Sequence, residues 1–220
     1  MAYLPCVEIE PKQAADAAVI WLHGLGADGH DFVPVVPHLG PASAPAVRFV
    51  FPHAPQIPVT INNGFVMRAW YDILELDLER RVDAAQLRAS AAAVAKLIDR
   101  ERERGIASQR ILLAGFSQGG AVGFELALSY PQRLAGLIAL STYFATADTV
   151  NPHPANRDLP ILICHGTADP LVAERFGRDS AERLRALGYA VDYRTYAVEH
   201  SVDMQEIKDI GTWINARLTT

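Results

Sequence analysis

The chain has 220 residues, of which 50% are apolar and 20% charged, and its formal net charge is −5. This length suits one α/β domain, residues 1–220, with a sizeable core, and the acidic balance without a basic cluster argues against a nucleic-acid partner. No apolar run reaches the length of a membrane span and the N-terminus does not resemble a signal peptide, so we expect a cytoplasmic protein.

Strand-like and helix-like patterns alternate in the first half of the chain. Short apolar runs predict strands at 17–22 and 47–51. A long helix is predicted to begin after an N-cap at Asp83, with Gln86 three residues later, and to end at Gly105. The mixed charges of 100–104 in its last turn are interpreted as a solvated face.

The second half continues the alternation. Strands are predicted at 111–114, 134–140, 161–164 and 191–196, and helices at 121–129, 173–187 and over a final segment carrying Ile207, Ile210, Ile214 and Leu218 on one face. Fully apolar strands alternating with helices indicate a mostly parallel sheet covered on both faces. The predicted fold class is therefore α/β.

Gly115-Phe116-Ser117-Gln118-Gly119 matches the Gly-x-Ser-x-Gly motif of a nucleophile elbow. It stands between the apolar run 111–114 and a helical stretch, as that motif requires. The serine must occupy the apex of a tight turn, and flanking glycines let the backbone bend there. The following helix points its free N–H groups toward a developing oxyanion. Ser117 is thus the predicted nucleophile.

A serine nucleophile needs a base and an orienting carboxylate, which follow it in this class in the order acid, then histidine. Asp169 follows the predicted strand 161–164, and open α/β sheets collect active-site residues at such strand ends. His200 follows the strand 191–196 and is the predicted base. Less suitable are the carboxylates Asp148, Asp158 and Asp179 and the histidines His38 and His153; His165 is interpreted as structural, and His30 and His53 stay ambiguous.

The segment His23-Gly24-Leu25-Gly26 follows the first central strand. We expect the Leu25 N–H to be one oxyanion donor and the Gln118 N–H the other, with His23 bracing the loop. The same region also matches Gly-x-Gly-x-x-Gly, a dinucleotide-binding pattern. That interpretation lacks a carboxylate at the end of the second strand, and Pro34 and Pro37 disfavour the helix it needs. No cofactor is expected.

Residues 53–78 are irregular but rich in apolar side chains, with Asn62-Asn63-Gly64 as a turn. Two interpretations stay open, and both can hold: a small hairpin at the sheet edge, or an apolar wall beside the serine. Phe65, Trp70 and Tyr71 are the candidates for substrate binding.

The two cysteines, Cys6 and Cys164, lie far apart in apolar contexts. We interpret them as buried free thiols in a reducing compartment. No Cys/His cluster has metal-binding spacing, so no metal site is expected.

Several of these segments together resemble the small bacterial carboxylesterases that are grouped with phospholipases and acyl-protein thioesterases. They are Trp21-Leu22-His23-Gly24-Leu25-Gly26, Trp70-Tyr71-Asp72, Gly115-Phe116-Ser117-Gln118-Gly119-Gly120, His165-Gly166-Thr167-Ala168-Asp169-Pro170 and His200-Ser201-Val202, which cover nearly the whole chain. The resemblance implies an α/β-hydrolase fold without a large cap domain. It implies the triad Ser117, Asp169 and His200, oxyanion donors at Leu25 and Gln118, and often a homodimer.

We therefore expect a serine carboxylesterase that cleaves short- to medium-chain esters through an acyl-enzyme. The same triad would serve an acyl-protein thioesterase or a lysophospholipase, and a non-catalytic binding protein on the same scaffold is a further alternative. Only the short segment 141–159 stands where larger relatives insert a cap, which predicts an open site. One residue departs from the family pattern: Glu199, directly before His200, either favours the protonated imidazole or points to water.

Overall fold

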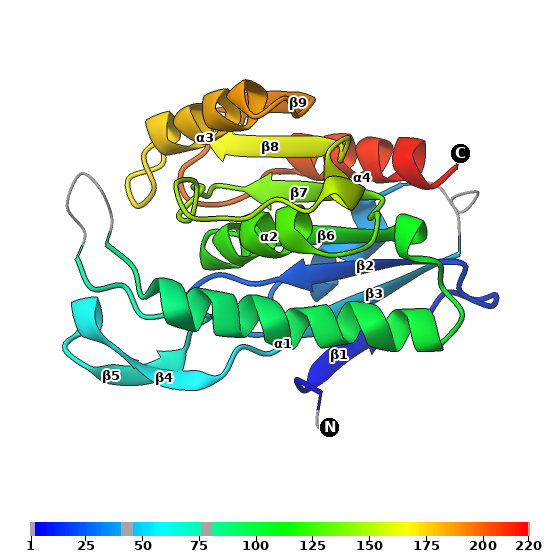
Figure 1. Cartoon of the computed structure of the whole chain (residues 1–220), viewed down its shortest axis with the longest axis horizontal. Coiled ribbons are helices and arrows are strands. Elements are labelled where there is room, and N and C mark those ends of the chain that lie inside the picture. The colour runs from blue at the N-terminus through cyan, green and yellow to red at the C-terminus, as the bar shows by residue number, and fades with distance from the viewer. Residues whose placement is uncertain (1–2, 41–45, 76–80, 220) are drawn as a thin grey trace.

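A computed structural model describes residues 3–40, 46–75 and 81–219. Its centre is a seven-stranded sheet (Figure 1). In spatial order the strands are β1 (Cys6–Ile9), β3 (Val47–Pro52), β2 (Ala17–Leu22), β6 (Ile111–Phe116), β7 (Gly136–Leu140), β8 (Ile161–Gly166) and β9 (Val191–Tyr196). Neighbouring strands run parallel, except that β1 pairs with β3 antiparallel. The predicted α/β class is confirmed.

Helices cover both faces of the sheet. Helices α1 (Ala84–Glu103), α2 (Gln118–Ser129) and α3 (Glu174–Ala186) lie on one face, and α4 (Met204–Leu218) lies on the other with the 3₁₀ segment Val33–His38 (Figure 1). Successive strand side chains point to opposite faces. In β6, Leu113 joins the core under α1 and α2, whereas Leu112 joins the core under α4. This arrangement is the α/β-hydrolase fold, without a large cap domain.

Two helix starts show what the sequence pattern could and could not indicate. The Asp83 carboxylate caps α1 as predicted, accepting the Gln86 N–H at 2.9 Å. Helix α2 instead begins at Gln118, three residues before the predicted start. The pattern missed this first turn because it contains Gly119 and Gly120, and glycine is a poor helix former.

The interpretation of 100–104 as a solvated face is wrong for one residue. Glu101 is fully buried, and its carboxylate pairs with Arg48 at 2.6 Å, Arg100 at 3.0 Å and Arg104 at 3.1 Å. The edge strand β1, which the sequence analysis did not predict, adds a second acid, Glu8, beside Arg100 and Arg104. The end of α1 is therefore held to the sheet edge by a charge network.

Strands β4 (Gln56–Val59) and β5 (Phe65–Arg68) form a separate antiparallel hairpin. The hairpin that we predicted as one interpretation of the irregular segment 53–78 is therefore present. Both cysteines are free, as predicted, but only Cys164 is fully buried. Cys6 is partly buried on the edge strand β1, and this burial raises the pKa of its thiol to about 11. Among the described residues, no helix has both the length and the apolar character needed to cross a membrane.

Candidate active site

Ser117 occupies the sharp turn between β6 and α2. Its backbone has a positive φ, with φ 53° and ψ −117°, a conformation that non-glycine residues seldom adopt and that concentrates at functional sites. The turn is crowded. A Cβ on Gly115 would collide with the Gly119 backbone, and a Cβ on Gly119 would collide with the Leu22 carbonyl. Glycine is thus required on both sides of Ser117 by close backbone approach.

Asp169 and His200 meet at the same edge of the sheet as Ser117. They follow β8 and β9, while Ser117 follows β6. His200 Nδ1 lies 2.6 Å from Asp169 Oδ2. Because an ionised carboxylate can only accept, Nδ1 carries the proton and Nε2 is left as a base. The Phe116 ring packs on the His200 imidazole, with centroids 4.7 Å apart.

The Asp169 carboxylate is held in place by the backbone. Its Oδ1 accepts the N–H groups of Leu171 at 2.9 Å and Val172 at 2.8 Å. Burial alone would raise the pKa of Asp169, but the hydrogen bond from His200 and the two backbone bonds outweigh burial and lower it. His165 supports this turn, since its buried Nε2 lies 2.8 Å from the Val172 carbonyl. That is the structural role interpreted from sequence.

The glycine loop, residues 23–29, passes directly beside the serine. A Cβ on Gly24 would lie 3.5 Å from Ser117 Cβ. Within the described residues the Leu25 N–H has no acceptor, and the Gln118 N–H, first in α2, has none inside its helix. Two backbone donors are therefore available close to the serine. The loop leads into a 3₁₀ segment rather than an α-helix, unlike a dinucleotide-binding turn.

The buried His23 side chain holds the glycine loop in place. Its Nδ1 lies 2.7 Å from the Gly24 carbonyl, and its Nε2 accepts the Ala54 N–H at 3.1 Å. Burial lowers the pKa of His23 to about 4, so the ring is neutral and fills both roles as one tautomer. The Trp70 indole N–H donates to the His23 carbonyl at 2.9 Å.

A cavity of about 380 Å³ opens at this edge of the sheet, and both Ser117 and His200 line it. Leu25 and Gln118 also line it. The other lining residues are mostly apolar: Gly24, Ala27, Asp31, Ile61, Asn62, Ile73, Phe116, Tyr143, Leu171 and Val172. Ile61, Asn62 and Ile73 come from the irregular segment, so this segment forms a wall as well as a hairpin.

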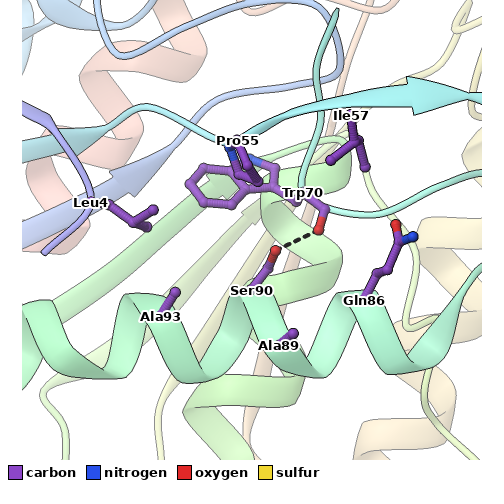
Figure 2. A pocket seen from close by; sticks show the side chains of 8 residues that line it. All are labelled: Leu4, Pro55, Ile57, Trp70, Gln86, Ala89, Ser90 and Ala93. Atoms are coloured by element: carbon purple, nitrogen blue, oxygen red, sulfur yellow. Dashed lines mark hydrogen bonds between the residues drawn. The ribbon is translucent and has the colours of Figure 1, made fainter. Parts of the chain in front are cut away.

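The three predicted substrate-binding residues do not line this cavity. Phe65 is 68% exposed on β5, and Tyr71 is buried with its hydroxyl 3.1 Å from that of Tyr143. Trp70 faces a second, smaller cavity of about 200 Å³ against α1, where Ser90 donates to its carbonyl (Figure 2). The apolar character of 53–78 was visible in the sequence, but the direction of each side chain depends on the fold of the hairpin.

Folding also brings together three residues whose spacing in sequence had no metal signature. Ligand atoms of Asp28, His30 and His53 lie within 4.8 Å of one another. His30 Nδ1 lies 3.0 Å from Asp28 Oδ1, and His53 Nδ1 accepts the Gly29 N–H at 3.0 Å. These contacts tie the end of the glycine loop to the segment after β3, which is the role that the geometry supports.

Glu199 is exposed, and within the described part of the chain its side chain has no ion pair. This position favours the interpretation that it points to water.

Comparison with known proteins supports the same family. The family model described as phospholipase/carboxylesterase matches residues 5–218. An acyl-protein thioesterase 1 from Cryptococcus neoformans is 37% identical over 94% of this chain and 95% of its own length. Another, from Neurospora crassa, is 38% identical over 92% of this chain and 87% of its own length. These relatives are fungal and named as thioesterases, so the narrower resemblance to bacterial carboxylesterases is not supported.

Solved structures extend the likeness. SOBER1 from Arabidopsis thaliana has a TM-score of 0.84 at 31% identity, covering 92% of this chain and 99% of its own. Acyl-protein thioesterase 2 from Zea mays has a TM-score of 0.85 at 28% identity, covering 98% of this chain and 100% of its own. The chain belongs to the phospholipase/carboxylesterase family of serine hydrolases with the α/β-hydrolase fold.

Proposed function

We propose that Ser117, His200 and Asp169 form the catalytic triad of an acyl thioester and ester hydrolase. The observation that carries this proposal is the 2.6 Å contact between His200 Nδ1 and Asp169 Oδ2, at the cavity that Ser117 and His200 line. The contact leaves His200 Nε2 free to take the serine proton. The strained backbone of Ser117 supports the same role.

The reaction proceeds in two steps. Ser117 Oγ attacks the acyl carbonyl while His200 takes its proton, and the Leu25 and Gln118 N–H groups hold the oxyanion. His200 then protonates the leaving thiol or alcohol, and water releases the acyl group from Ser117 by the same route. Asp169 stays ionised, holding the His200 tautomer that can act as a base. Neither a metal nor a cofactor is required.

Thioester cleavage is the preferred activity in this proposal. The related proteins from Cryptococcus neoformans and Neurospora crassa are named acyl-protein thioesterases, which supports the thioester alternative over a simple carboxylesterase. Carboxylesterase activity remains the second candidate, because the triad does not itself choose the leaving group. The mostly apolar cavity of about 380 Å³ supports acyl chains of short to medium length.

The test is hydrolysis of ester and thioester pairs that share one acyl group, in a series of increasing chain length. We expect wild type to cleave both, with the higher kcat/KM on thioesters and a maximum at short or medium chains. Ser117→Ala should abolish both activities while the far-UV circular dichroism stays unchanged. Undiminished turnover in Ser117→Ala would refute the proposed nucleophile, whereas absence of turnover in wild type would favour the binding-protein interpretation.

A cytoplasmic location is part of the proposal, supported by the two free cysteines. A homodimer also stays a prediction, which light scattering of the purified protein would test.

A further inference from the structure

The cavity that holds Ser117 contains one acidic side chain. Among the described residues that line it, only Asp31 is a carboxylate, and none is a lysine or an arginine. The remaining wall is apolar apart from Asn62, Tyr143 and the groups of the proposed catalytic site. Asp31 is therefore the side chain of this described wall that can carry a negative charge.

The Asp31 carboxylate has no partner in the described part of the chain, in either a hydrogen bond or an ion pair. The Asp31 residue is exposed to solvent, but it lines the concave wall of the cavity, so its carboxyl is partly desolvated. This desolvation raises the pKa of the Asp31 carboxyl, and the nearby charge of Asp28 raises it further. Both effects disfavour the anion, and a positive group placed beside the carboxylate would offset them by direct attraction. Carboxylates that hold the backbone in place have donors around them, as Asp72 and Asp83 do here.

We propose that Asp31 makes this site selective for substrates whose leaving group carries a positive charge, such as a quaternary ammonium or a protonated amine. This inference rests on the proposed function, because it concerns the substrate of the same serine. The argument for the leaving group comes from the kinds of side chain that line the cavity. Ile61, Ile73 and Leu171 offer the apolar surface that an acyl chain needs, whereas a carboxylate is a poor neighbour for such a chain, so we assign Asp31 to the other half of the substrate.

The test compares two thioesters of equal shape. Butyrylthiocholine carries a quaternary ammonium, and S-(3,3-dimethylbutyl) thiobutyrate replaces that nitrogen with carbon. The measured quantity is the ratio of kcat/KM for the charged over the neutral thioester. In wild type we expect this ratio to exceed that of Asp31→Asn by about two- to fivefold, the range for a solvent-exposed ion pair. The excess should shrink in high salt because exposed charges are screened.

Asp158→Asn is the matched control. It removes the same charge from a side chain that is 77% exposed and does not line the cavity, so it should keep the wild-type ratio. An equal ratio in wild type and Asp31→Asn would overturn the inference, and so would an equal fall of the ratio in Asp158→Asn, which would indicate an effect of net charge.

A binding measurement separates this inference from the proposed function. Calorimetry on Ser117→Ala compares the two thioesters without turnover. We expect tighter binding of butyrylthiocholine than of its neutral isostere, and loss of that difference in the double variant with Asp31→Asn. Equal binding of both thioesters to Ser117→Ala would refute the role of Asp31. Failure of wild type to hydrolyse the neutral thioester would instead refute the proposed function.

Discussion

The side-chain carbonyl of Gln118 accepts the backbone N–H of Trp70 at 3.0 Å, and the Gln118 amide donates to the Tyr71 carbonyl at 2.9 Å. Gln118 is buried, being 2% exposed. Trp70 in turn donates from its indole to the carbonyl of His23. The residue that follows the proposed nucleophile thus connects α2, through one tryptophan, to the base of the glycine loop. The two proposed oxyanion donors, on Gln118 and Leu25, are held relative to each other by this chain of contacts.

Replacing Gln118 with alanine should therefore destabilise the protein. The change keeps the backbone N–H of residue 118 but leaves two buried backbone groups, on Trp70 and Tyr71, without partners. We expect a loss of about 2–4 kcal/mol in the free energy of unfolding, measured by urea titration. Gln109→Ala is the control, since Gln109 is exposed and should change stability by less than about 0.5 kcal/mol. Equal stabilities of the two variants would contradict the bracing role.

Asp169→Asn tests the orientation of His200. An asparagine oxygen can still accept the Leu171 and Val172 N–H groups, so the turn should keep its shape. The amide presented to His200 Nδ1 favours the wrong tautomer, with the proton on Nε2. We expect kcat to fall by about 10⁴-fold while the melting temperature changes little. A fall of less than tenfold in kcat, with the fold intact, would place the orienting carboxylate elsewhere.

The position of the candidate site could be predicted from the sequence for a simple physical reason. Ser117 and Asp169 each follow a buried, mainly apolar strand, and His200 follows the mixed strand β9. The carboxyl ends of these parallel strands meet at one edge of the sheet. Knowing which strand each residue follows is thus enough to predict that the three residues lie close together, without knowing any side-chain contact. The α/β class and most strand boundaries follow from the same periodicity.

The cavity wall could not be predicted in the same way. Tyr143 and Leu171 lie in irregular segments, where no periodicity indicates which side chains face inward. Trp70 is a further example. Its apolar side chain would suit either the cavity beside Ser117 or the smaller cavity against α1, and the sequence does not indicate which. The burial of Glu101 was also hidden, since the Arg48 that pairs with it is 53 positions away in sequence.

Gly119→Ala tests whether the nucleophile elbow requires a residue without a side chain at position 119. The new Cβ would collide with the Leu22 carbonyl, which belongs to β2 and cannot move aside. Gly123→Ala is the matched control in the same helix, because its Cβ would meet only the terminal methyl of Leu137, at 3.1 Å. Both changes bring the same gain in helix propensity, about 1 kcal/mol. We expect Gly119→Ala to lose labelling of Ser117 by a fluorophosphonate and Gly123→Ala to retain it; equal labelling would show that the close approach at Gly119 is not required.

The burial of Glu206 predicts how the free energy of unfolding depends on pH. The residue is fully buried at the start of α4, and neither carboxyl oxygen has a partner in the described part of the chain. Burial raises its pKa from 4.5 to about 8, with smaller contributions from Asp203 and Asp209. The Cys164 thiol of β8 lies within its electrostatic influence. The folded protein therefore keeps a proton on Glu206 at pH values where the unfolded chain has released it.

Rising pH then favours the unfolded state between about pH 4.5 and 8. The contribution of Glu206 to stability is complete below 4.5, falls by at most about 1.4 kcal/mol per pH unit in this window, and is constant above it. Glu206→Gln removes the titration, because an amide resembles the neutral acid. We expect the stability of the variant relative to wild type to increase from pH 5 to pH 8 in urea titrations, and then to level off. A stability difference independent of pH would mean that Glu206 is ionised in the folded protein with a counter-charge or water beside it.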